Sequence, residues 1–134
     1  MKIGIDTNLL VRLVIGDDRA QQNIAAEALE GAELVAISVH VFCEFAWVLD
    51  RSYRVSKPDL SDAIRRILSM RNVVASRPAI EAGLAVLDAG GDFADGVIAF
   101  DSRWLGGDTF VSFDRHAIKL IETQGIPALL LSGQ

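Results

Sequence analysis

Short apolar segments alternate along the chain with longer segments in which apolar residues recur every three or four positions. Short runs that are apolar throughout are typical of strands buried on both faces of a parallel sheet. The longer segments have the spacing of a helix with one apolar face. The pattern therefore predicts strands at residues 2–5, 34–37, 72–75, 109–112 and 126–131.

Polar residues and glycines divide the longer segments into helices. Ser38 and Asp92 stand where an N-cap is expected, and Ser56 opens a Ser-x-x-Asp capping box with Pro58 in the first turn. Gly31 and Gly125 are suited to helix C-termini. We predict helices at about residues 9–14, 17–30, 39–53, 57–68, 77–89, 92–104 and 114–123.

This order of elements predicts an α/β fold. Alternating short strands and helices imply a parallel sheet that is covered by helices on both faces, with right-handed crossovers. The length of 134 residues is that of a single domain with a substantial core. We therefore expect one domain over residues 1–134.

Composition indicates where in the cell the protein is expected and which partners are excluded. No apolar run approaches the roughly 20 residues that cross a bilayer, and the N-terminus lacks a signal-peptide pattern. A lone cysteine, Cys43, suits a reducing compartment. We expect a cytoplasmic protein without a membrane partner. A hydrophobic content of 51% favours oligomerisation, and a net charge of −5 argues against broad, nonspecific binding of nucleic acid.

Acidic residues at the ends of elements are the main candidates for chemistry. Asp6 directly follows the first strand, and Asp114 comes two residues after the strand at 109–112. Glu44 lies in the second turn of its predicted helix and Asp95 in the first turn of another. Ligands of open parallel sheets bind beyond the carboxyl ends of the strands. We therefore expect these four acids at one edge of the sheet, where a cation would relieve their mutual repulsion.

The donor set indicates which cation to expect. Mg²⁺ and Mn²⁺ prefer carboxylate and water ligands, and no pairing of His or Cys suggests zinc. Such ions generate a nucleophile from water and neutralise charge in phosphodiester hydrolysis. A purely structural reading is also open, in which Asp6, Asp92 and Asp114 are N-caps and Asp95 favours the helix dipole.

The order and spacing of these motifs resemble the PIN domain. The matching segments are Ile5-Asp6-Thr7-Asn8, Ser38-x5-Glu44, Asp92-Phe93-Ala94-Asp95-Gly96-Val97-Ile98-Ala99 and Ser112-Phe113-Asp114. Within that group, the compact length is similar to that of the VapC toxins of bacterial toxin–antitoxin pairs. Ser112 replaces a threonine that is common before Phe-Asp and keeps the hydroxyl.

The resemblance implies a specific fold and activity. It implies a three-layer α/β/α sandwich with a parallel five-stranded sheet in the order 3-2-1-4-5, and a Mg²⁺- or Mn²⁺-dependent endoribonuclease that inhibits translation. Asp6, Glu44, Asp95 and Asp114 would be both catalytic and metal-binding, with Asp92 contributing through a water or another ligand. RNA would be the substrate, a VapB-like antitoxin the inhibitor and a homodimer the assembly.

Three alternatives compete with this reading. An aspartate-based phosphatase needs a second Asp two residues after the nucleophile, where this chain has Asn8. A phosphoacceptor receiver domain needs paired acids after the first strand and a lysine after the last, and neither is evident. A non-catalytic acidic groove that binds a protein would not need all four acids. Arginines such as Arg115 are candidates for a phosphate-binding rim, although ordinary helix-surface roles are favoured for each.

Overall fold

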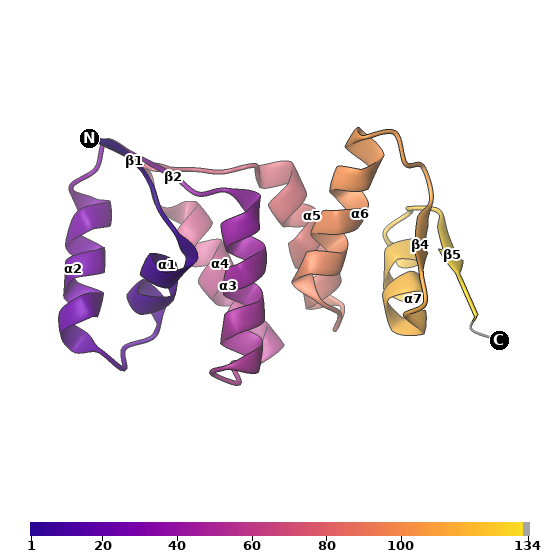
Figure 1. Cartoon of the computed structure of the whole chain (residues 1–134), viewed down its shortest axis with the longest axis horizontal. Coiled ribbons are helices and arrows are strands. Elements are labelled where there is room, and N and C mark those ends of the chain that lie inside the picture. Colours follow the sequence, from indigo (N-terminus) through magenta and orange to yellow (C-terminus); the bar gives the residue numbers. More distant parts are fainter. Residues whose placement is uncertain (133–134) are drawn as a thin grey trace. The chain divides into compact units, whose positions relative to one another are not determined.

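The computed structural model describes residues 1–132 and divides into two compact units, Met1–Ser76 and Arg77–Gln134 (Figure 1). Each unit combines helices with parallel strands. None of the helices within residues 1–132 is both long and apolar enough to cross a membrane.

The first unit has a parallel three-stranded sheet in the order β1-β2-β3. Ile3 of β1 is aligned with Val35 of β2, and Val35 is aligned with Val73 of β3. The predicted order 3-2-1 is therefore confirmed within this unit. Its elements are β1 (Lys2–Gly4), α1 (Thr7–Val14), α2 (Arg19–Glu30), β2 (Leu34–Ala36), α3 (Val39–Arg51), α4 (Lys57–Ser69) and β3 (Val73–Val74).

Side-chain caps start the helices of the first unit. Ser38 accepts a hydrogen bond from the backbone N–H of Val41 at 3.3 Å, and Ser56 accepts one from Asp59 at 3.3 Å. Both bonds satisfy a backbone donor that the first turn of a helix leaves without a partner. The predicted N-cap roles of these two serines are confirmed.

Apolar side chains from the helices and from β2 form the core of the first unit. Asn72 joins elements at its border, because its amide donates to the carbonyl oxygens of Leu29 at 2.8 Å and Ala32 at 3.0 Å. These bonds satisfy carbonyl groups at the end of α2. The largest fully buried side chains here are Leu10, Leu29, Val35, Phe42, Phe45, Leu49 and Ile64.

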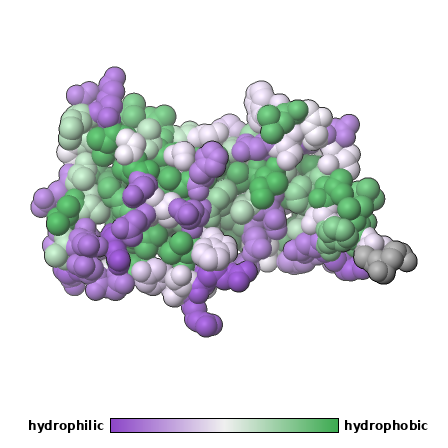
Figure 2. All heavy atoms as spheres, in the orientation of Figure 1, coloured by the Kyte–Doolittle hydropathy of each residue, from purple (hydrophilic) through white to green (hydrophobic). Residues whose placement is uncertain are grey.

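The second unit pairs β4 with β5 in parallel, with Val111 aligned with Leu129. Its core includes Val86, Ala99, Leu120 and Ile121. Val111 and Leu129 are about half exposed, and Figure 2 shows hydrophobic side chains over this sheet. The elements of this unit are α5 (Arg77–Asp88), α6 (Phe93–Trp104), β4 (Phe110–Ser112), α7 (Arg115–Thr123) and β5 (Ala128–Leu130).

Two glycines let α5 and α6 pack closely. A Cβ atom on Gly83 would lie 2.7 Å from Cε1 of Phe93, and one on Gly96 would overlap the carbonyl oxygen of Ala82. Contacts this short are not tolerated by real side chains, so both positions require glycine. Because Gly96 follows Asp95 directly, this packing also fixes the start of α6.

The predicted α/β fold with parallel strands is confirmed, and every predicted element is present. The last strand is shorter than the predicted 126–131. Pro127 has no N–H for the sheet, although its carbonyl oxygen accepts from Phe110 at 2.8 Å. The pairing of β1 with β4 that would complete the order 3-2-1-4-5 stays a prediction, as does the expectation of a single domain.

Candidate functional site

Asp6 stands at the junction between β1 and α1. It is the N-cap of α1, and its Oδ1 atom accepts a hydrogen bond from the backbone N–H of Leu9 at 2.9 Å. A carboxylate offers about four lone-pair sites, so this bond leaves acceptor capacity for a cation. The side chain is exposed. The structural role and the chemical role considered for Asp6 are therefore compatible.

Glu44 reaches the surface from α3. Its neighbours Phe42 and Phe45 are fully buried, whereas Glu44 is exposed. The β1–β2 ladder extends to Ile5, whose N–H donates to the carbonyl oxygen of Ala36 at 3.3 Å. Because β1 and β2 are parallel, Asp6 and the start of α3 follow their strands at the same edge of the sheet. Both candidate acids of the first unit, Asp6 and Glu44, thus belong to elements that leave this edge.

Asp114 connects β4 to α7 in the second unit. Its Oδ1 atom accepts from the backbone N–H of Ala117 at 3.0 Å, which makes it the N-cap of α7. The backbone N–H of Asp114 in turn donates to Oγ of Ser112 at 3.0 Å. The hydroxyl that precedes Phe113 therefore fixes the turn that carries the Asp114 carboxylate.

Asp95 and Asp92 lie at the start of α6. Asp95 is in the first turn and is half-buried, and Asp92 occupies the N-cap position. We expected Asp92 to cap this helix. That expectation is wrong in one respect, because within the described residues its side chain makes no capping hydrogen bond to α6.

Three candidate acids of the second unit, Asp92, Asp95 and Asp114, form an electrostatic cluster. Burial raises the pKa of the Asp95 carboxyl above its ordinary value of 3.8, and the charges of Asp92 and Asp114 raise it further. Both effects disfavour the ionised form of Asp95. The charge of Asp114 therefore acts on Asp95 within this unit, although the two residues are 19 positions apart in the sequence.

His116 has a contact that the sequence does not reveal. Its Nε2 atom lies 3.2 Å from the carbonyl oxygen of Gly90, to which it donates when that nitrogen is protonated. The contact joins the first turn of α7 to the loop that precedes Asp92. It spans 26 positions, so no local spacing signals it. His116 is thus a candidate for positioning the turn of Asp114 relative to Asp92.

The candidate acids match the ligand preference of a hard divalent cation. All donors are carboxylates, which are the ligands that Mg²⁺ and Mn²⁺ prefer. Burial raises the pKa of Asp95, and the like charges of Asp92 and Asp114 add a repulsion that a cation would offset. Within residues 1–132, no three His, Cys, Asp or Glu side chains form a ready-made metal-binding group in either unit. The chemistry of the donors therefore fits such an ion, and water ligands would complete its coordination.

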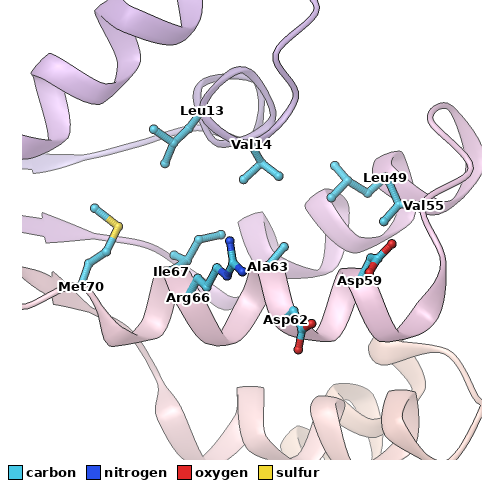
Figure 3. A pocket seen from close by; sticks show the side chains of 10 residues that line it. All are labelled: Leu13, Val14, Leu49, Val55, Asp59, Asp62, Ala63, Arg66, Ile67 and Met70. Carbon is cyan, nitrogen blue, oxygen red and sulfur yellow. The ribbon is translucent and has the colours of Figure 1, made fainter.

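A separate cavity of about 560 Å³ lies between α1, α3 and α4 of the first unit. Asp59, Asp62 and Arg66 of α4 contribute its polar groups. Its apolar side chains point toward one another across the cavity (Figure 3). An apolar cavity with acidic groups is suited to a hydrophobic segment that carries basic residues. The apolar lining comprises Leu13, Val14, Leu49, Val55, Ala63, Ile67 and Met70.

Comparison with known families agrees with the motifs. A family model described as "PIN domain" matches residues 3–122, which include all four candidate acids and parts of both units. A search of curated proteins finds no match.

Proposed function

Because the chain belongs to the PIN domain family, whose members are generally metal-dependent nucleases, we propose that it is an endoribonuclease that requires Mg²⁺ or Mn²⁺. The observation that carries the proposal is the acidic cluster of the second unit. Burial raises the pKa of Asp95, and the charges of Asp92 and Asp114 raise it further, so these carboxylates lie near enough for their charges to interact.

We assign the site to Asp6, Glu44, Asp95 and Asp114, with Asp92 in a supporting role. When bound, the divalent ion supplies charge neutralisation and lowers the pKa of a coordinated water. Asp6 and Asp114 are oriented by their bonds to Leu9 and Ala117, which hold each carboxylate at the start of a helix. Attack by water on the phosphodiester leaves 5′-phosphate and 3′-hydroxyl ends.

We further propose that the protein is a VapC-like toxin that inhibits translation in the cytoplasm. PIN nucleases often pair with antitoxins, and the apolar cavity of the first unit suits an amphipathic segment of a VapB-like partner. Arginine or lysine on that segment would pair with Asp59 and Asp62. The exposed aromatic side chains of Trp47 and Trp104 support assembly as a homodimer.

The test is cleavage of total RNA with Mg²⁺, Mn²⁺ or EDTA, followed by mapping of the ends. Asp6→Asn and Asp95→Asn are each expected to lower the rate by at least about 100-fold, because each removes a charged ligand. Glu30→Gln and Glu122→Gln are matched controls, since both residues are exposed acids outside the site. Undiminished cleavage by either Asp→Asn variant would contradict the assignment.

The same assay distinguishes a non-catalytic acidic groove that only binds protein. Such a protein would leave RNA intact with either metal. It would still bind its partner, and the wild type and both Asp→Asn variants would behave alike in the cleavage assay.

A further inference from the structure

A small cavity lies beside Asp6 between α1 and α2, both of which belong to the first unit. Its volume is about 320 Å³. Asn8, Arg12 and Gln21 line it together with Asp6, and Leu9 and Ile24 supply apolar surface. None of these residues except Asp6 is assigned to the metal site. The cavity therefore combines a proposed catalytic carboxylate with polar and apolar groups that the proposed cleavage chemistry does not use.

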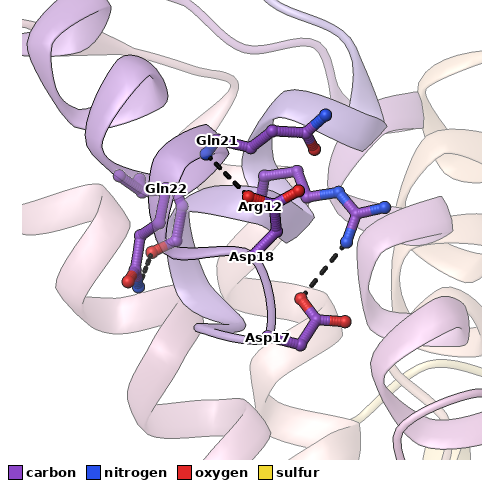
Figure 4. A network of polar contacts seen from close by, with 6 residues as sticks. Arg12, Asp17, Asp18, Gln21 and Gln22 are labelled. Carbon is purple, nitrogen blue, oxygen red and sulfur yellow. Dashed lines mark hydrogen bonds and ion pairs between the residues drawn. The ribbon is translucent and has the colours of Figure 1, made fainter.

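Arg12 brings a partly exposed guanidinium group to this cavity. One end of its guanidinium is held by Asp17, with Nη1 3.2 Å from Oδ1 (Figure 4). Its Nε atom is buried and has no hydrogen-bond partner among the described residues. The Arg12 side chain is 30% exposed, so its guanidinium can donate to a ligand only through its exposed nitrogen atoms. The cavity is thus suited to a ligand that carries an acceptor near the exposed end of Arg12.

Two carboxamides add hydrogen-bonding groups of both kinds. Gln21 is fixed at the start of α2, where its backbone N–H donates to Oδ1 of Asp18 at 3.0 Å (Figure 4). Asn8 lies in the first turn of α1, two residues after Asp6. Each carboxamide offers a carbonyl acceptor and an NH₂ donor. Asn and Gln read the edges of nucleobases with this pair of groups.

We propose that this cavity binds one unpaired base of the RNA substrate, next to the phosphodiester that is cleaved. The inference rests on the proposed ribonuclease function and adds a specificity pocket to it. Leu9 and Ile24 contact the face of the base, the carboxamides contact its edge and Arg12 donates to a base or phosphate oxygen. Such contacts need a base whose face and edge are both free, so the substrate is single-stranded at this position.

The experiment measures cleavage of an RNA library with a randomised single-stranded segment, in Mg²⁺, by sequencing the products. Gln21→Ala removes an edge contact and is expected to reduce the preference at one nucleotide position by about fivefold or more. Ala28→Leu adds bulk to a residue that lines the cavity and is expected to raise KM several-fold. Their matched controls are Asn23→Ala and Ala20→Leu, which alter exposed residues of α2 outside the cavity.

The outcomes separate this inference from the proposed function. A wild-type protein that leaves the library intact would contradict the nuclease proposal itself. A cleaving wild type whose Gln21→Ala and Ala28→Leu variants keep both its sequence profile and its KM would overturn the pocket. So would variants that change only neutralisation by an antitoxin, because the cavity would then belong to a protein partner. Circular dichroism of each variant verifies that it is folded.

Discussion

Asp6 and Asp114 each combine two tasks in one side chain. Each accepts a backbone hydrogen bond as an N-cap, at 2.9 Å from Leu9 and 3.0 Å from Ala117. From the sequence alone, a role as N-cap and a role as metal ligand were alternative interpretations of these aspartates. The geometry makes them complementary, because the cap bond holds the carboxylate where a helix follows a strand. The two tasks differ in one property: capping needs an oxygen acceptor, whereas binding of a cation depends on charge.

Substitutions that keep the oxygen but remove the charge separate these tasks. Asp6→Asn and Asp114→Asn should lower the free energy of unfolding by no more than about 1 kcal/mol, because Asn caps as well as Asp and only electrostatic interactions change. At Asp114, the lost attraction to the helix dipole is partly offset by relief of the repulsion with Asp95. Asp6→Ala and Asp114→Ala should cost about 0.5–2 kcal/mol through loss of the cap. Urea unfolding in EDTA measures both. Equal losses in the Asn and Ala variants would show that the cap bond contributes nothing.

The raised pKa of Asp95 predicts how stability depends on pH. Between its ordinary value of 3.8 and its raised value in the folded protein, Asp95 binds more protons when folded than when unfolded. Its contribution to stability is therefore complete below pH 3.8 and is lost as the pH rises through the folded pKa. Unfolding in EDTA across this range should show a shallower fall for Asp95→Asn than for the wild type. Identical pH profiles of the two proteins would contradict the raised pKa.

At the scale of elements, caps and glycines were the most readable signals in the sequence. Ser38 and Ser56 start their helices as predicted, and Gly125 has the positive φ of 83° expected just after α7. Local hydrogen bonding determines these features, so local sequence reveals them. Asp92 shows that local sequence does not reveal every cap, because this residue occupies the N-cap position without making the cap bond. The orientation of an acidic side chain depends on its surroundings as well as on its position in the helix.

The close contact of α5 with α6 was not readable in this way. Gly83 and Gly96 have no turn role that their sequence neighbours would signal, and their need for glycine arises only when two helices meet. The Gly96–Ala82 contact is one residue from Asp95, so the packing of this pair also positions a candidate ligand. A change there should act on stability and on the site together.

Gly96→Ala tests this coupling. The added methyl would overlap the Ala82 carbonyl group, and such overpacking typically costs about 1–3 kcal/mol. We expect a lower midpoint in urea and a weaker response to Mg²⁺, because α6 must move away from α5. Ile98→Ala is the control, since Ile98 is half exposed on the same helix. An unchanged midpoint in Gly96→Ala would mean that α5 and α6 separate easily.

At the scale of the whole molecule, the candidate acids are divided between the units. Asp6 and Glu44 belong to the first unit, and Asp95 and Asp114 belong to the second. The acids were identifiable from sequence because each stands near the start of a helix that follows a strand or a glycine loop. The cavity beside Asp6 was not, because it arises from how α1 and α2 pack rather than from any spacing along the chain.

Because the proposed ligands come from both units, we expect substitution of an acid in either unit to weaken metal binding. A ligand that binds only the folded protein stabilises it by about 2.7 kcal/mol at 100 times its Kd, so saturating Mg²⁺ should raise the Tm of the wild type. Glu44→Gln and Asp95→Asn should each reduce this rise, whereas Glu30→Gln and Glu122→Gln should preserve it. Thermal unfolding in Mg²⁺ and in EDTA measures the difference. If Glu44→Gln kept the full rise while Asp95→Asn lost it, the ion would be held by the acids of the second unit. The first unit would then contribute to cleavage through Asp6 and its neighbouring cavity by positioning the substrate.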